Sequence, residues 1–231
     1  MILILASIVD KNAQRLAEAC NSARIYTCKD LAIGKLALRG SGPDHSSITV
    51  DEQRIPVKEI DCIVNLLPYV LQDELYFFPP EERGYQAEEF AAMINYFISF
   101  IKCPVVNRLS LISLSGMSFN AIHWYNLASK LCIPVYPVEL DTHYELLSNT
   151  PKEKLVDIIY FNGKIISHNR SIGNEYTFKL ATRARVDYLK ASYYQAESDQ
   201  LQFVRARTSP DINDNDTLEA IVEYIHSIDK K

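Results

Sequence analysis

Two arginines late in the chain, Arg205 and Arg207, are spaced so that they can act together on one ligand. We predict a β-strand over 201–207, and side chains two positions apart on a strand point to the same face. A guanidinium offers only hydrogen-bond donors in a planar fork, so this pair suits a phosphate, a carboxylate or an acidic peptide. Arg183 and Arg185 on the preceding predicted helix favour the same interpretation. The alternative is an exposed face of an edge strand that binds nothing.

A second set of polar side chains lies where predicted strands end or helices begin. Such positions carry the binding groups of many α/β folds, and arginines there suit a small acidic substrate such as an amino acid or a peptide carboxylate. The alternative is structural: hydrogen bonds from the asparagines anchor loops to strand ends, and Arg83 pairs with nearby glutamates. Together with the strand arginines, the candidate ligand-binding residues are Asn65, Arg83, Asn107, Arg108, His123, Arg205 and Arg207.

No catalytic residue and no metal or cofactor site is predicted. His123 has no identifiable orienting carboxylate or nucleophile, so we expect a structural or interface role for it and for the neighbouring Trp124. The histidines, cysteines and acidic residues show no metal-ligand spacing, and the motifs of P-loops, serine hydrolases and zinc proteases do not occur. The five cysteines are scattered, and we expect Cys62 and Cys103 to be buried free thiols.

The composition is that of an ordinary globular protein. Its 231 residues are 48% hydrophobic and carry a formal net charge of -5, which weighs against binding to nucleic acid or to an anionic membrane. The opening residues lack the basic leader of a signal peptide, and no apolar run approaches the roughly 20 residues of a membrane-spanning helix. We therefore expect a cytoplasmic protein.

Strands and helices alternate in the first part of the chain. Apolar runs at 2–8 and 61–67 predict buried strands, and the apolar stripe of 83–103 predicts the longest helix. A further helix, capped by Ser118, is predicted at 118–132. This order indicates an open, mostly parallel sheet with flanking helices in a domain over 1–142.

The remainder, 143–231, predicts a smaller α+β unit. Asn162-Gly163 is the strongest two-residue hairpin signal in the chain. We then expect a helix at 174–186 with Phe178, Ala181 and Ala184 facing inward, strands at 187–195 and 201–207, and a final helix capped by Asp216.

The segment 68–80 is unusual because it is apolar although it is predicted to be a loop. Such a surface either packs onto the body of the protein or is reserved for a partner. The candidate interface residues are Tyr69, Leu71, Tyr76, Phe77 and Phe78.

Two stretches of the chain resemble ATP-grasp ligases, in particular those of peptide maturation. Residues 61–108 resemble the domain that precedes the catalytic core, and 175–211 resemble the end of that core. The residues that carry the first resemblance are Cys62-Ile-Val-Asn65-Leu, Glu82-Arg83-Gly-Tyr85-Gln-Ala-Glu88-Glu89, Cys103-Pro-Val-Val-Asn107-Arg108 and Asn120-Ala-Ile-His123-Trp124. The second is carried by Phe203-Val-Arg205-Ala-Arg207-Thr-Ser-Pro210-Asp211.

The resemblance implies a degenerate enzyme. The stretch between the two matches is too short for the lid that covers the nucleotide, and the positions of the family's acidic and asparagine magnesium ligands fall on Arg205 and Arg207. We therefore expect a non-catalytic accessory protein that partners an ATP-grasp ligase or its peptide substrate. An enzyme or binder acting on a small acidic substrate at the strand ends, and a homodimeric scaffold, remain as alternatives.

Overall fold

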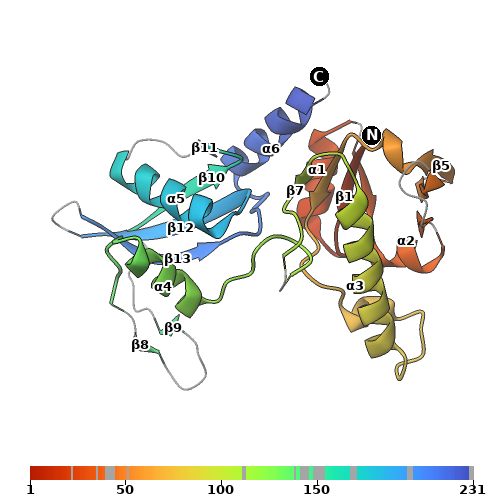
Figure 1. Ribbon diagram of the computed structural model, residues 1–231, viewed down its shortest axis with the longest axis horizontal. Helices are drawn as coiled ribbons and strands as arrows, with labels where there is room; N and C mark the ends of the chain where they lie inside the picture. Colours follow the sequence, from red (N-terminus) through yellow and green to blue (C-terminus); the bar gives the residue numbers. More distant parts are fainter. Residues whose placement is uncertain are drawn as a thin grey trace. The chain divides into compact units, whose positions relative to one another are not determined.

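The computed structural model describes residues 1–21, 23–34, 36–39, 45–50, 52–110, 113–137, 139–140, 146–147, 154–166, 171–196 and 200–228. Its internal contacts divide the chain into two compact units (Figure 1). Unit 1 comprises 1–116 and 211–231, and unit 2 comprises 117–210. The boundary that the sequence predicts at residue 142 lies outside the described residues, and the division into 1–142 and 143–231 stays a prediction.

A four-stranded parallel sheet forms the centre of unit 1, with strand order β2-β1-β6-β7. Its strands are β1 (Ile2–Leu5), β2 (Ala23–Tyr26), β6 (Cys62–Asn65) and β7 (Val105–Val106). Every residue of β1 and β6 is buried, which explains their continuous apolar sequences, because a parallel sheet is covered on both faces. Helix α1 (Lys11–Ala19) connects β1 to β2, and the Asp10 side chain caps it by accepting from the Asn12 amide at 2.8 Å. The predicted mostly parallel sheet with flanking helices is confirmed.

Helix α3 (Arg83–Phe100) covers one face of this sheet (Figure 1). Phe90, Ile94 and Phe97 share a core with sheet residues of β1, β6 and β7. The helix ends three residues before the predicted 103, and Ile101 is already extended with ψ 139°. Pro104 explains this end, because the residue before a proline disfavours helical backbone and Pro104 cannot continue the helix.

The remaining elements of unit 1 surround the sheet. They are α2 (Cys28–Ala32), β3 (Leu36–Ala37), β4 (Ser47–Val50), β5 (Gln53–Pro56), the 3-10 helices η2 (Val57–Glu59) and η3 (Gln72–Leu75), and α6 (Asn215–Ile228). The last of these is joined to α1 by Arg15, whose guanidinium donates to the Ile212 carbonyl at 2.8 Å and to Asn215 Oδ1 at 2.6 Å.

Unit 2 is built on a four-stranded antiparallel sheet with order β11-β10-β12-β13. Its strands are β10 (Leu155–Phe161), β11 (Lys164–Ile165), β12 (Tyr188–Gln195) and β13 (Leu201–Arg207). Asn162 and Gly163 join β10 to β11 with φ of 44° and 87°, the left-handed conformations that a tight hairpin of this kind requires. Short strands β8 (Glu139–Leu140) and β9 (Leu146–Leu147) form a separate ribbon.

Helices α4 (Ala121–Lys130) and α5 (Ser171–Ala184) contribute to the core of unit 2. Trp124 and Leu180 lie there with Tyr193 and Phe203 of the sheet, so Trp124 has the structural role that the sequence predicts. The predicted inward position of Phe178 is wrong: its side chain is 45% exposed, and Leu180 is buried instead. The face of α5 that packs on the sheet decides which side chains are buried, and the helix periodicity alone does not predict that face.

Two predicted helix caps are also wrong. Asn120, and not Ser118, caps α4, because its side chain accepts from the His123 amide at 2.9 Å. The last helix begins two residues earlier than expected: the Asp214 side chain accepts from the Asp216 amide at 3.1 Å, so Asp214 holds the capping position expected for Asp216. Serine, asparagine and aspartate side chains can all cap the N-terminus of a helix, so two such residues close in sequence are alternative caps.

No disulfide joins the cysteines within the described residues, and Cys62 is buried as predicted whereas Cys103 is only half-buried. Burial raises the pKa of the Cys103 thiol to about 11. Within the described residues, no helix is both long and apolar enough to cross a bilayer.

Candidate functional site

A row of polar side chains crosses three strands of unit 2. Asp157 of β10 is the cross-strand partner of Ser192 on β12, which in turn is the partner of Arg205 on β13. In the next row, Lys190 is paired with Arg207. The residues that alternate with these positions point into the core shared with α4 and α5, so both polar rows occupy the opposite face of the sheet.

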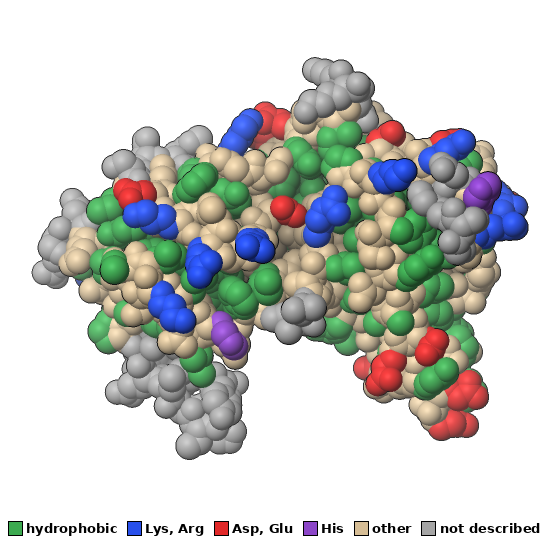
Figure 2. Space-filling model, in the orientation of Figure 1, with side chains coloured by type: hydrophobic (Ala, Val, Ile, Leu, Met, Phe, Trp, Pro, Cys, Tyr) green, Lys and Arg blue, Asp and Glu red, His purple; other side chains and the backbone are tan. Residues whose placement is uncertain are grey.

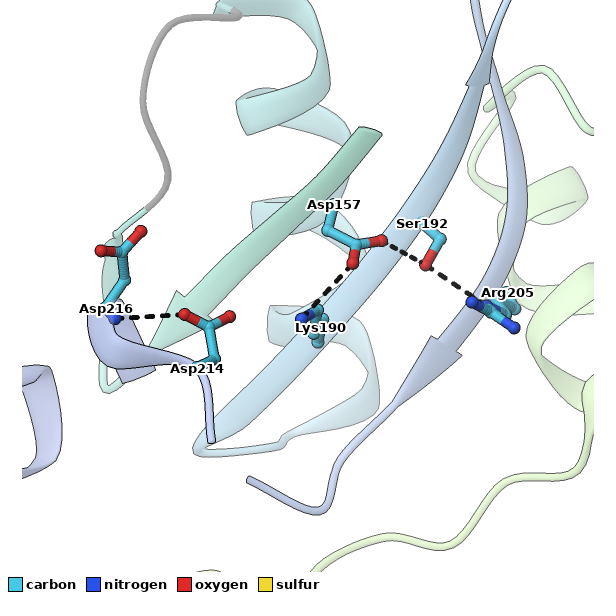
Figure 3. A network of polar contacts seen from close by, with 6 residues as sticks. All are labelled: Asp157, Lys190, Ser192, Arg205, Asp214 and Asp216. Carbon is cyan, nitrogen blue, oxygen red and sulfur yellow. Dashed lines mark hydrogen bonds and ion pairs between the residues drawn. The ribbon is translucent and has the colours of Figure 1, made fainter. Parts of the chain in front are cut away.

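Hydrogen bonds and an ion pair connect these side chains (Figure 3). The Ser192 hydroxyl donates to Asp157 Oδ1 at 2.6 Å, and Arg205 Nε lies 3.5 Å from the same hydroxyl oxygen. Lys190 Nζ lies 3.4 Å from Asp157 Oδ2. Because Ser192 accepts from one side and donates to the other, it sets the direction of the Arg205 side chain relative to the carboxylate.

The two rows line a pocket of about 210 Å³. Its lining residues are Asp157, Lys190, Ser192, Arg205, Ala206 and Arg207. Three of these side chains are cationic and one is anionic, so the pocket carries a net positive charge. Arg205 and Arg207 are exposed, and the terminal nitrogens of Arg205 make no hydrogen bond within the part of the chain that the structure describes. The arrangement can therefore hold an oxyanion from solvent through paired guanidinium forks.

This lining is unsuited to a divalent cation. Magnesium takes oxygen ligands, and among the described lining residues Asp157 supplies the single carboxylate. No cluster of three or more histidine, cysteine or acidic side chains suited to a metal is found among the described residues.

Arg183 and Arg185 do not contribute to this pocket. Both are exposed near the end of α5, which packs on the other face of the sheet, and neither lines the cavity. The expectation that they support the strand arginines was wrong, because the side of the sheet covered by a helix is decided by packing and not by nearness in sequence.

Asn65 and Asn107, two of the predicted strand-end residues, lie together in unit 1. Asn65 is fully buried at the end of β6, where its side-chain amide donates to the Leu114 carbonyl and, at 3.4 Å, to the Asn107 carbonyl. Its side-chain oxygen accepts from the Leu67 amide at 3.2 Å. Asn107 is also buried, with φ 60°, and it packs beside Gly116. These contacts tie the two strand ends to the loop that follows β7.

The three other candidate ligand-binding residues, Arg83, Arg108 and His123, lie in different surroundings. Arg83 opens α3, and its guanidinium donates to the carbonyls of Phe78 at 3.1 Å and Tyr76 at 3.3 Å, where the sequence suggested glutamate partners. Arg108 is exposed after β7. His123 is exposed on α4 of unit 2, with Nδ1 2.8 Å from the capping oxygen of Asn120.

Replacing Arg83 with glutamine is expected to lower the free energy of unfolding by about 1–2 kcal/mol, because two backbone carbonyls lose their donor. Urea denaturation followed by circular dichroism measures this change, with Glu82→Gln on the neighbouring exposed residue as the control. Unchanged stability together with lost binding of free glutamate would instead assign Arg83 to a ligand site.

The predicted interface segment forms part of the surface of unit 1. Tyr69, Leu71, Tyr76 and Phe77 are 61%, 42%, 56% and 37% exposed. Phe78 differs from them, because it is half-buried and its ring lies 6.1 Å from the core ring of Phe90. Part of this segment therefore packs onto the body, and part of it faces solvent.

Comparison with known proteins identifies the architecture. No family model and no curated protein matches the sequence. Among solved structures, the ATP-grasp ligase PsnB complexed with minimal precursor, Mg and ADP superposes with a TM-score of 0.69 over 100% of this chain and 98% of its own, at 10% identity. The chain has the ATP-grasp fold. The macrocyclase MdnB from Microcystis aeruginosa MRC is similar (TM-score 0.66, 97% and 98% coverage, 12% identity). D-alanine-D-alanine ligase from Aeromonas hydrophila is more distant, with a TM-score of 0.53 over 97% of this chain and 94% of its own, at 12% identity.

Within this ATP-grasp fold, sequence reasoning found the arginines of the pocket but missed Asp157, Lys190 and Ser192. Lys190 and Ser192 lie two positions apart in the sequence, as Arg205 and Arg207 do, so on a strand they also share one face. A search for polar pairs at this spacing in adjacent predicted strands would have found them. No sequence signal reveals that Asp157 faces Ser192, because the pairing of β10 with β12 joins residues on either side of α5.

Proposed function

We propose that the chain is a non-catalytic, peptide-associated protein built on the ATP-grasp fold. It would bind a peptide substrate, or an ATP-grasp ligase that acts on one. The observation that carries this proposal is the lining of the unit 2 pocket, where Arg205 and Arg207 occupy the positions at which the resemblance places magnesium ligands.

A cationic lining opposes the chemistry of the related ligases. Guanidinium and ammonium groups have no lone pair to offer a metal, and their charges repel a dication. Asp157 is the only carboxylate among the lining residues that the structure describes, and it is already engaged by Lys190 and Ser192. Metal-bridged ATP phosphates would therefore lack the ligands that the resemblance assigns to this place.

The same lining favours an acidic peptide group. Within the described lining, three cations and one carboxylate leave an excess of two positive charges, which matches a pair of glutamate or aspartate side chains or one side chain beside a C-terminal carboxylate. The Asp157–Ser192–Arg205 row restrains Arg205 in advance, so less side-chain entropy is lost on binding. PsnB has been captured with its precursor peptide PsnA2, which supports a peptide as the class of ligand.

We further infer that the protein acts in the cytoplasm, where its cysteine thiols would stay reduced.

Calorimetry tests the proposal. Titration with ATP in the presence of magnesium is expected to give no magnesium-dependent binding at micromolar concentrations, and incubation to release no ADP. A short synthetic peptide with two adjacent glutamates is expected to bind, whereas the same peptide with glutamines is not. Magnesium-dependent ATP binding, or equal binding of both peptides, would contradict the proposal.

A further inference from the structure

A second surface, on unit 1, combines exposed apolar side chains with exposed acidic ones. We call it the apolar platform and define it as Tyr69, Leu71, Tyr76, Phe77 and Tyr85, the last of which is 64% exposed. Figure 2 shows apolar and acidic side chains intermixed at the end of unit 1 where η3 and the start of α3 lie in Figure 1.

The platform is firmly attached to the core beneath it. Leu75 of η3 is fully buried, and the buried Glu74 carboxylate accepts from the Ser7 hydroxyl at 2.5 Å and from the Ile8 amide at 3.4 Å. Burial and the nearby Glu74 carboxylate together raise the pKa of the Cys28 thiol to about 12, burial having the larger effect.

The rings of the platform are also ordered. Those of Tyr76 and Phe77 pack edge to face at 5.5 Å, and the Phe77 ring lies 5.0 Å from that of Phe78. Arg83 holds the carbonyls on both sides of Phe77. A partner would therefore meet a surface whose shape is already set, and binding would cost little ordering entropy.

The charge around the platform is predominantly negative. Asp73, Glu81, Glu82, Glu88 and Glu89 are exposed, and none has an ion-pair partner within the described ranges. From residue 59 to residue 101, Arg83 is the only basic residue in the sequence, and its guanidinium is turned toward backbone carbonyls.

This charge distinguishes between possible occupants. An anionic membrane, a nucleic acid or an acidic peptide would be repelled. A second copy joined by a two-fold axis would place the same carboxylates against each other, which is unfavourable for an isologous dimer. A basic segment avoids both costs, and its lysines or arginines can also lie over the exposed tyrosine rings.

We propose that the apolar platform docks a basic amphipathic segment of another protein, with apolar side chains on the rings and lysine or arginine side chains on the surrounding carboxylates. The platform shares no residue with the arginine pocket, and this inference stands even if that pocket binds nothing.

Selection from a library of random short peptides displayed on phage tests the proposal on the full chain. Peptides that bind the wild type but not the Tyr76→Ser/Phe77→Ser variant are expected to share a net positive charge and at least one large apolar residue. A neutral or acidic consensus would overturn the proposal, and so would the absence of any peptide that depends on the platform.

A synthetic peptide of the selected consensus then allows affinities to be measured by fluorescence anisotropy. We expect about tenfold weaker binding for Tyr76→Ser/Phe77→Ser, weaker binding for Glu81→Gln/Glu82→Gln, and a loss of affinity with added salt. Phe178→Ser removes a similarly exposed ring from unit 2 and is the matched control. Unchanged melting temperatures show that the variants fold.

Two further results decide the outcome. Arg205→Gln/Arg207→Gln should bind this peptide as the wild type does, whereas binding of the diglutamate peptide should be weakened by that variant and unchanged by Tyr76→Ser/Phe77→Ser. Light scattering that shows a dimer, dissociated by Tyr76→Ser/Phe77→Ser, would overturn the proposal in favour of a second copy as the occupant.

Discussion

Replacing Arg205 and Arg207 together with glutamine is expected to weaken binding of the diglutamate peptide by about a hundredfold. Hydrogen bonds to charged groups contribute about 1.5–3 kcal/mol each, and the lower end of this range applies because both arginine side chains are exposed. Isothermal titration calorimetry on the full chain measures the change. Each single variant should retain part of the affinity, since the other guanidinium and Lys190 remain.

The matched control for this experiment is Arg183→Gln/Arg185→Gln. It removes the same charge from exposed positions of the chain, but these residues do not line the pocket. We expect the control to keep nearly all of the affinity and the melting temperature to stay constant in both double variants. An equal loss in both would show that the overall field of the protein, and not the pocket, attracts the peptide.

Replacing Asn65 with alanine is expected to lower the free energy of unfolding by about 3–5 kcal/mol. The substitution leaves the buried Leu67 amide and the Leu114 carbonyl without their partner, at about 1–3 kcal/mol for each unsatisfied group, and it also leaves a small cavity. Small domains are stable by only about 5–15 kcal/mol, so the loss would be a large fraction of the total.

Urea denaturation followed by far-ultraviolet circular dichroism measures this effect. Asn126→Ala, at an exposed position of α4, is the control and should change stability by less than about 0.5 kcal/mol. A change below about 1 kcal/mol for Asn65→Ala would contradict a structural role and return Asn65 to the candidate ligand-binding residues.

The class of fold follows from short-range patterns that need no tertiary context. The apolar runs of β1 and β6 indicate strands covered on both faces, and the stripe at Ala13 and Leu16 indicates the helix that joins β1 to β2. The hairpin at Asn162-Gly163 follows equally directly, because few other residue pairs adopt two successive left-handed conformations.

The predictions from the sequence were wrong where two nearby residues could fill the same local role. Ser118 and Asn120 are both competent caps, and Asn120 is favoured because its side chain reaches the His123 amide. The outward position of Phe178 has a similar origin. Phe178 and Leu180 are both large apolar residues of α5, and the packing of the helix on the sheet buries Leu180.

The candidate ligand-binding residues at the strand ends show the same limit of prediction from sequence. Their types and positions are compatible with ligand binding, but the structure gives the Asn65 side chain and the Arg83 guanidinium partners on the backbone. A sequence shows which donors are available. It does not show which carbonyls come within reach of them, because these belong to loops whose paths depend on the packing around them.

That Arg205 and Arg207 share one face of a strand can be predicted from their spacing, because the period of two is a local property of the backbone. The residues that surround them depend on how the strands pair. The pairing of β12 with β10 and β13, including the shift in register between Ser192 and Tyr193, brings Asp157, Lys190 and Ser192 to the same face. That pairing depends on contacts between residues far apart in the chain, so the composition of the pocket could be known only after folding.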